Sequence, residues 1–349
     1  MADERDAHES AAALPWPSPF PWQQQAMREA LAQRSTWPHA LLIHGPRGIG
    51  KHALALGFAQ ALLCESPRAD QLACGECPGC RYAVAGQHPD LMRLELIEVD
   101  DEDGELQPVD AITIPRVRAL IRFVTLTSHR QRAKVGVIAP AERMNAQAAN
   151  ALLKTLEEPP PGTFLILAAD QQGMLPATIG SRCRRLAAPQ PTADEACAWL
   201  AAQGVAEPAL ALAQAAGAPR VALELADAER QAERRAWLTA LAHPERLGVI
   251  ALSARIDAGA RDGRRARLAR AVDWVLAWTA DLVRAKAGDG ARRNPDFARE
   301  VQQLAARVAP VAVFRYHDSL LRQRVLLAHP LQPRWVAEAM LIDYRALFR

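Results

Sequence analysis

Short apolar runs alternate along the first half of the chain with stretches in which apolar residues recur every three or four positions. The runs have the length and composition of buried strands and lie at residues 40–43, 91–97, 134–138 and 164–167. The helical spacing occupies residues 23–33, 53–63, 116–125 and 146–156. Strands that alternate with helices favour a parallel sheet with helices on both faces.

The pattern changes after Cys183, where the strand signal fades. Pro189 and Pro191 mark a linker, and residues 193–349 have the spacing of helices rich in Ala, Leu and Arg. An α/β module is therefore followed by an all-helical half. The tryptophans of that half follow helical apolar patterns, so we expect core positions rather than base-stacking platforms for Trp199, Trp237, Trp274, Trp278 and Trp335.

Composition narrows the class of protein. Half of the 349 residues are hydrophobic, and 42 Lys and Arg against 39 Asp and Glu leave a formal charge of +3, too small to indicate a broad polyanion-binding surface. No uncharged apolar run reaches the ~18 residues that a membrane span needs, and the polar start has no apolar core. We expect a cytoplasmic protein with no membrane partner.

Two charged stretches leave their roles open. The acidic run 95–105 is expected to be a solvated loop. Residues 116–134 carry six Lys or Arg and no acid, which suits either a phosphate backbone or a solvated helix face.

Four of the six cysteines crowd into residues 64–80 with the spacing C-x₉-C-x₂-C-x₂-C. Such tight spacing lets the sulfurs converge on one Zn²⁺, and four thiolates close a tetrahedral site with no open position, so the site would be structural. Unligated buried cysteines, a redox pair and a zinc-ribbon DNA reader are the alternatives. The candidate ligands are Cys64, Cys74, Cys77 and Cys80.

A glycine-rich turn, Gly45-Pro-Arg-Gly-Ile-Gly-Lys51, lies between a predicted strand and a predicted helix. In that context, backbone N–H groups and a lysine surround a polyphosphate. His52 stands where such turns carry the Ser or Thr that holds Mg²⁺, and imidazole is a poor ligand for a hard cation. The candidate nucleotide-binding residues are Gly45, Gly48, Gly50, Lys51 and His52.

Hydrolysis also needs a carboxylate at the end of a neighbouring strand. The strand 134–138 ends in Ala139-Pro140, and Glu142 comes two to three residues too late. We therefore expect little or no intrinsic ATPase, while binding of ATP or ADP without turnover stays open. No carboxylate pair for nucleotidyl transfer is evident, so we expect no polymerase activity either.

Ser181-Arg182-Cys183 ends the α/β module. Its arginine is either a solvated charge or an arginine finger, a planar cation offered to the γ-phosphate held by a neighbouring subunit.

The order of these motifs closely resembles that of bacterial clamp-loader subunits of the AAA+ class. Its most specific part is the string Asn150-Ala-Leu-Leu-Lys-Thr-Leu-Glu-Glu-Pro-Pro160, and the resemblance covers most of residues 20–225. ATP-hydrolysing gamma/tau subunits have Asp-Glu where Ala139-Pro140 stand and Thr where Ala168-Ala169 stand. Within the family, the degenerate site therefore indicates a non-hydrolysing subunit that helps to load the sliding clamp during DNA replication.

The resemblance implies an architecture and partners. It implies a Pro-rich lead-in over 1–22, an AAA+ α/β domain over 23–190 with a zinc module at 64–80, a helical lid over 191–229 and a helical collar over 230–349. The collar would hold a heteropentamer with gamma/tau and delta subunits, which engages the sliding clamp and primed DNA. Arg182 would complete the ATP site of an adjacent gamma/tau subunit. Arg220 matches a nucleotide-sensing lid arginine and would be mainly positional here.

Two other classes of function remain as alternatives. One is a catalytically active AAA+ ATPase of the gamma/tau type, against which the missing hydroxyl and acid argue. The other is a stand-alone zinc-dependent nucleic-acid-binding protein, against which the small net charge argues.

Overall fold

The computed structural model describes residues 16–33, 37–99, 106–170, 172–260, 263–326 and 332–349. The chain divides into two compact units, Met1–Pro191 and Thr192–Arg349. The first is an α/β unit and the second is helical.

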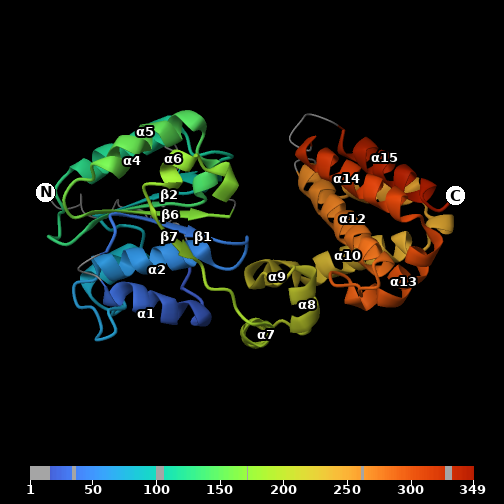
Figure 1. Ribbon diagram of the computed structural model, residues 1–349, viewed down its shortest axis with the longest axis horizontal. Helices are drawn as coiled ribbons and strands as arrows, with labels where there is room; N and C mark the ends of the chain where they lie inside the picture. Colours follow the sequence, from blue (N-terminus) through green and yellow to red (C-terminus); the bar gives the residue numbers. More distant parts are fainter. Residues whose placement is uncertain (1–15, 34–36, 100–105, 171, 261–262, 327–331) are drawn as a thin grey trace, which may run out of the picture. The chain divides into compact units, whose positions relative to one another are not determined.

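A five-stranded sheet with the order β2-β5-β6-β1-β7 forms the centre of the first unit. All neighbouring strands in it are parallel (Figure 1). Its strands are β1 (Ala40–His44), β2 (Leu91–Leu94), β5 (Lys134–Ile138), β6 (Thr163–Ala169) and β7 (Arg184–Ala187). The predicted parallel sheet and three of its predicted strands are therefore confirmed.

Three predictions about strands and the acidic run were wrong. The run 91–97 is split between β2 and a hairpin of β3 (Ile97–Val99) and β4 (Leu106–Pro108). Glu95, expected in a solvated loop, is only 6% exposed; residues 100–105 lie outside the described residues. The edge strand β7 follows Cys183, where no strand was expected, because its mostly exposed side chains form no apolar run.

Helices cover both faces of the sheet, with α1 and α2 on one side and α4, α5 and α6 on the other (Figure 1). Phe58 of α2 belongs to the first core and Leu152 of α5 to the second, each packed against alternate residues of the strands. The helices are α1 (Gln24–Ala32), α2 (Lys51–Leu63), α3 (Pro78–Val84), α4 (Ile114–Thr125), α5 (Ala146–Glu157) and α6 (Ala177–Gly180).

The second unit contains two separate apolar clusters, one on α7–α9 and the other across α10–α15. The chain breaks at Gly217–Pro219, Gly288–Gly290 and Pro310 lie at helix boundaries, as predicted, with Pro219 and Pro310 as the first residues of their helices. Its helices are α7 (Ala193–Ala202), α8 (Pro208–Gln214), α9 (Pro219–Leu225), α10 (Ala228–Leu241), α11 (Val249–Ser253), α12 (Arg264–Lys286), α13 (Ala298–Arg307), α14 (Pro310–Leu326) and α15 (Pro333–Ala346).

The tryptophans divide between core and surface. Trp237 and Trp278 are fully buried, and Trp274 is buried as well. Trp335 was expected in the core but is 69% exposed. It lies near the start of α15, on the side turned away from buried Ala337 and Tyr344.

Among the described residues, none of the helices combines the length and the apolar composition that crossing a membrane requires.

A degenerate phosphate loop, an edge arginine and a candidate metal centre

The glycine-rich turn runs from the end of β1 to the start of α2, as its sequence predicted. Gly50 caps α2 with a φ of 89°, and a Cβ atom there would lie 2.3 Å from the ring of Phe20. A side chain at this position would therefore be strained and would clash. Gln23 Nε2 also donates to the Ile49 carbonyl at 2.9 Å, so residues just before α1 pack directly on the turn.

Lys51 already has an anionic partner from its own chain. Its Nζ lies 2.5 Å from Asp170 Oδ1 and donates to the Pro46 carbonyl, and the residue is only 5% exposed. Asp170 follows the last residue of β6, the strand beside β1. The sequence analysis missed Asp170, although a carboxylate directly after a buried parallel strand is a usable signal because the carboxyl ends of neighbouring strands meet at one edge.

His52, at the position where a magnesium-binding hydroxyl would be, contacts a buried carboxylate. Its Nε2 lies 3.0 Å from Glu95 Oε1, which also accepts from Arg93 Nε at 2.5 Å. Burial raises the pKa of Glu95, but His52 and Arg93 outweigh burial and hold that pKa below its usual value. The His52 side chain therefore contacts a carboxylate and offers no oxygen ligand for a metal.

Glu142, the nearest acid after β5, contacts the residue that follows β6. Its Oε1 accepts from the backbone N–H of Asp170 at 2.9 Å. Ala139-Pro140, which follow the last residue of β5, carry no carboxylate. Within the described residues, neither oxygen ligand expected of a hydrolytic magnesium site is in place at this loop.

Arg182 lies at the amino ends of the parallel strands, and Lys51 lies beyond their carboxyl ends, which form the opposite side of the sheet. β1 and β7 run parallel with Leu41 opposite Arg184, so Arg182 precedes the first residues of the strands while Lys51 follows their last. Five residues of β1 separate the two edges by roughly 17 Å at about 3.3 Å per residue. The guanidinium therefore cannot serve the phosphate loop of its own chain.

The side chain of Arg182 is ordered by contacts within the chain. Its Nε donates to Glu157 Oε1 at 2.7 Å, its Nη2 pairs with the same oxygen, and its Nη1 donates to the Thr178 carbonyl at 2.9 Å. The side chain is still 32% exposed. Glu157 was part of the motif string that carried the family resemblance, but the sequence alone did not connect it to Arg182.

Arg220, the other predicted nucleotide-site residue, belongs to the helical unit. It is the second residue of α9. Its side chain is 54% exposed, and its Nε lies 3.9 Å from Glu224 Oε1.

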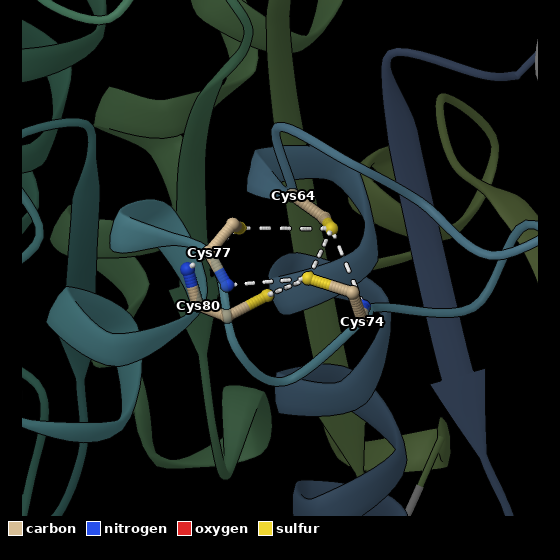
Figure 2. Close-up of side chains that lie close together, drawn as sticks. All are labelled: Cys64, Cys74, Cys77 and Cys80. Carbon is tan, nitrogen blue, oxygen red and sulfur yellow. Dashed lines mark hydrogen bonds between the residues drawn. The ribbon is translucent and has the colours of Figure 1, made fainter.

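The four clustered cysteines converge as their spacing predicted (Figure 2). Cys64 ends α2, Cys77 caps α3 and Cys80 lies within α3. Sγ–Sγ separations are 3.6 Å for Cys64–Cys74 and 3.9 Å for both Cys64–Cys77 and Cys74–Cys80. A tetrahedron of sulfurs about 2.3 Å from one zinc ion has edges of about 3.8 Å. The four residues therefore fit zinc.

Backbone donors surround two of these sulfurs. Burial raises the pKa of Cys77, but the N–H groups of Cys80 and Glu65 outweigh it and bring the pKa to about 6. The N–H groups of Cys77 and Glu76 also lower the pKa of Cys74. Thiolates, the form that binds metal, are therefore favoured at these two positions.

The basic stretch 116–134 is used mainly inside the unit. Arg116 donates to the Glu95 and Ile97 carbonyls, Lys134 pairs with Asp90, and Arg130 pairs with Glu65. These contacts argue against a continuous phosphate-binding face, one of the two interpretations that the sequence allowed.

Comparison with known proteins identifies the family. The family described as "DNA polymerase III, delta subunit" matches residues 22–192. The DNA polymerase III subunit delta' of Pseudomonas aeruginosa is 36% identical over 336 residues, which cover 94% of this chain and 98% of that protein. The chain belongs to the delta' family.

Other relatives agree with this assignment. The delta' subunit of Haemophilus influenzae is 31% identical over 84% of each chain, and that of Escherichia coli is 34% identical over 64% of this chain and 66% of that one. Apart from these relatives, a solved gamma-subunit-related protein from Thermotoga maritima covers 94% of this chain and 100% of that one with a TM-score of 0.48 at 17% identity, a likeness too distant to bear on the assignment. Membership in the delta' family confirms the resemblance noted from the motifs.

Proposed function

We propose that this chain is a non-hydrolysing member of a bacterial clamp loader that helps to place the sliding clamp on primed DNA. In this proposal, it assembles with gamma/tau and delta subunits in a heteropentamer and supplies Arg182 to the ATP site of a gamma/tau neighbour. The observation that carries the proposal is the position of Arg182 at the sheet edge opposite Lys51.

Arg182 acts on a partner's phosphate in this proposal because it cannot reach its own loop. A guanidinium placed against a γ-phosphate neutralises charge that develops during phosphoryl transfer. Its planar fork matches two phosphate oxygens at once, which an ammonium cannot do. The partner supplies the nucleotide, the metal and the attacking water.

The absence of turnover at Lys51 follows from the ligands found there. His52 offers no oxygen to Mg²⁺ and contacts Glu95, and Glu142 comes after Ala139-Pro140 and gives its Oε1 to the Asp170 N–H. ATP or ADP binding without turnover remains part of the proposal, and the phosphates must then displace Asp170 from the Lys51 amine.

The zinc ion would be held by Cys64, Cys74, Cys77 and Cys80, and its chemistry would be structural. A closed four-sulfur site joins the end of α2 to the start of α3 and leaves no position for substrate. The lid over 191–229 and the collar over 230–349 stay predictions, with the collar as the surface that assembles the ring.

The test is ATP turnover by a loader reconstituted from this chain, its gamma/tau and delta partners, the clamp and primed DNA. Arg182→Ala should lower turnover at the served site by ~10³-fold or more, since a fully used finger contributes ~10³–10⁵. Arg182→Lys should rescue little of the loss. Arg184→Ala, which removes an exposed arginine two residues away, is the matched control.

Assembly must be measured in parallel by size-exclusion chromatography. If Arg182→Ala causes a large loss of turnover in an intact ring, the result supports Arg182 as an arginine finger. Unchanged turnover with Arg182→Ala contradicts that role. The isolated chain should show no turnover above background; turnover that Lys51→Ala abolishes would instead support the active-ATPase alternative.

A further inference from the structure

Where α5 meets the link between α6 and β7, a carboxylate contacts the guanidinium of Arg182. We propose that Glu157 is a positioning residue that holds the Arg182 guanidinium in the orientation used on the neighbour's phosphate. The proposal rests on the function proposed above, because it has content only if Arg182 acts in trans.

The pattern of donors explains how Glu157 can hold the finger without blocking it. A guanidinium has five N–H donors in one plane. Glu157 occupies the side formed by Nε and Nη2, and the Thr178 carbonyl takes one Nη1 donor. The contact from Nη1 to Ser181 Oγ is long, at 3.4 Å. The outer edge formed by Nη1 and Nη2 is the one that a pair of phosphate oxygens can take, with one oxygen replacing the long Ser181 contact.

Glu157 is carried by a well-fixed element. It is the last residue of α5, whose N-terminus is capped by the Asn145 side chain accepting from the Ala148 N–H at 2.8 Å. Leu152 and Leu156 of the same helix are buried in the core against the sheet. The carboxylate thus extends from a rigid scaffold, as a group that fixes the orientation of another side chain must.

The backbone of Arg182 is fixed as well. Its N–H donates to the Ile179 carbonyl at 3.1 Å, and the next residue, Cys183, is buried in the same core as Leu156. What remains free to vary is the long side chain, which has many rotamers in water. The carboxylate selects among those rotamers before the neighbour arrives, so less order has to be imposed when the site closes.

The opposite arrangement is physically possible and makes the opposite prediction. If Glu157 held the guanidinium away from the neighbour, its removal would release the finger and raise turnover. The carboxylate would then compete with the γ-phosphate for the same donors. The use of the Nε side, which leaves the outer edge for phosphate, favours positioning over sequestration.

The experiment uses the fully reconstituted loader with clamp and primed DNA, and compares five forms of this chain besides wild type. They are Glu157→Ala, Glu157→Gln, Arg182→Ala, the double variant Glu157→Ala/Arg182→Ala, and the control Glu158→Ala, which removes an exposed carboxylate from the next position. The kcat and the KM for ATP are measured, with ring assembly monitored for each form.

We expect Glu157→Ala to lower kcat about tenfold with KM and assembly unchanged, since a misplaced catalytic group costs up to ~10²-fold. Glu157→Gln should recover part of the loss because it keeps an acceptor oxygen. In the Arg182→Ala background, Glu157→Ala should change nothing further, a dependence that a purely structural role would not produce.

The remaining outcomes overturn the proposal in distinguishable ways. If Arg182→Ala lowers turnover but Glu157→Ala does not, the finger stands and the positioning role is wrong. If Glu157→Ala raises turnover, or lowers it equally in both backgrounds, or prevents assembly, Glu157 does not position Arg182. If Arg182→Ala itself has no effect, the function proposed for the chain fails.

Discussion

Lys51 shows how one residue can keep its place in a motif while its environment changes what it does. A phosphate-binding lysine is ordinarily available to an anion, but here Asp170 lies 2.5 Å from its amine. Any nucleotide must compete with a carboxylate that is covalently part of the same chain. We therefore expect the loop to bind nucleotide more weakly than its sequence motif alone would predict.

Replacing Asp170 by Asn should raise the affinity for a fluorescent ADP analogue about tenfold, because the competing charge is removed and repulsion between Asp170 and phosphate is lost. Lys51→Ala should lower that affinity, and Asp194→Asn on α7 should leave it unchanged. Since His52 replaces the magnesium-binding hydroxyl, chelation of Mg²⁺ should have little effect. The affinities are measured by fluorescence anisotropy. Equal affinities for wild type and Asp170→Asn would show that Asp170 does not compete with the nucleotide for Lys51.

At the scale of elements, the cysteine cluster joins the end of α2 to the start of α3. A module this short buries little apolar surface of its own, so a bound zinc ion would supply the crosslink. We expect one zinc per chain by atomic absorption. Removal of zinc by a chelator, or Cys74→Ser, should lower the thermal midpoint by at least about 5 °C. Cys197→Ser on α7 is the control; an unchanged midpoint after complete metal loss would contradict a structural role.

The strand β2 is linked to β5 by a buried ion pair between Asp90 and Lys134, whose Nζ–Oδ1 distance is 3.0 Å. Burial raises the pKa of Asp90, but the N–H groups of His129 and Arg130, the Lys134 amine and the Ser128 hydroxyl outweigh it and hold the pKa at about 2. Because this folded-state pKa lies below the unfolded value of about 3.9, the stabilisation is present above pH 4 and is lost as the pH falls towards 2.

Asp90→Asn should therefore cost about 3–5 kcal/mol at pH 7, because it leaves the Lys134 ammonium buried without its counter-charge. The difference in unfolding free energy between variant and wild type should shrink between pH 4 and pH 2. Urea unfolding at several pH values measures both effects, with the exposed Asp110→Asn as control. A difference that does not change with pH would mean that the carboxylate charge is not what Asp90 contributes.

Across the whole chain, the sequence predicted those features that depend on residues close together in the sequence. Apolar runs identified β1, β5 and β6, and close cysteine spacing identified the cluster of four cysteines, because both signals are local. The pairs that define the site were not predictable in this way. Asp170 meets Lys51 through the pairing of β6 with β1, and Glu157 meets Arg182 because α5 packs beside α6. Trp335 was misplaced because helical periodicity shows that a helix has an apolar side, not that every apolar residue lies on it.

The order of the strands also bears on how the chain folds as it is synthesised. β1 is among the first elements made, yet both of its neighbours, β6 and β7, come from residues 163–187. Because synthesis proceeds at about 5–20 residues per second, β1 leaves the ribosome on the order of ten seconds before its partner strands. During that interval its backbone donors and apolar side chains lack their native neighbours, and contacts this distant in sequence form slowly. Overproduction at low temperature or with chaperones should thus favour soluble chain over aggregate.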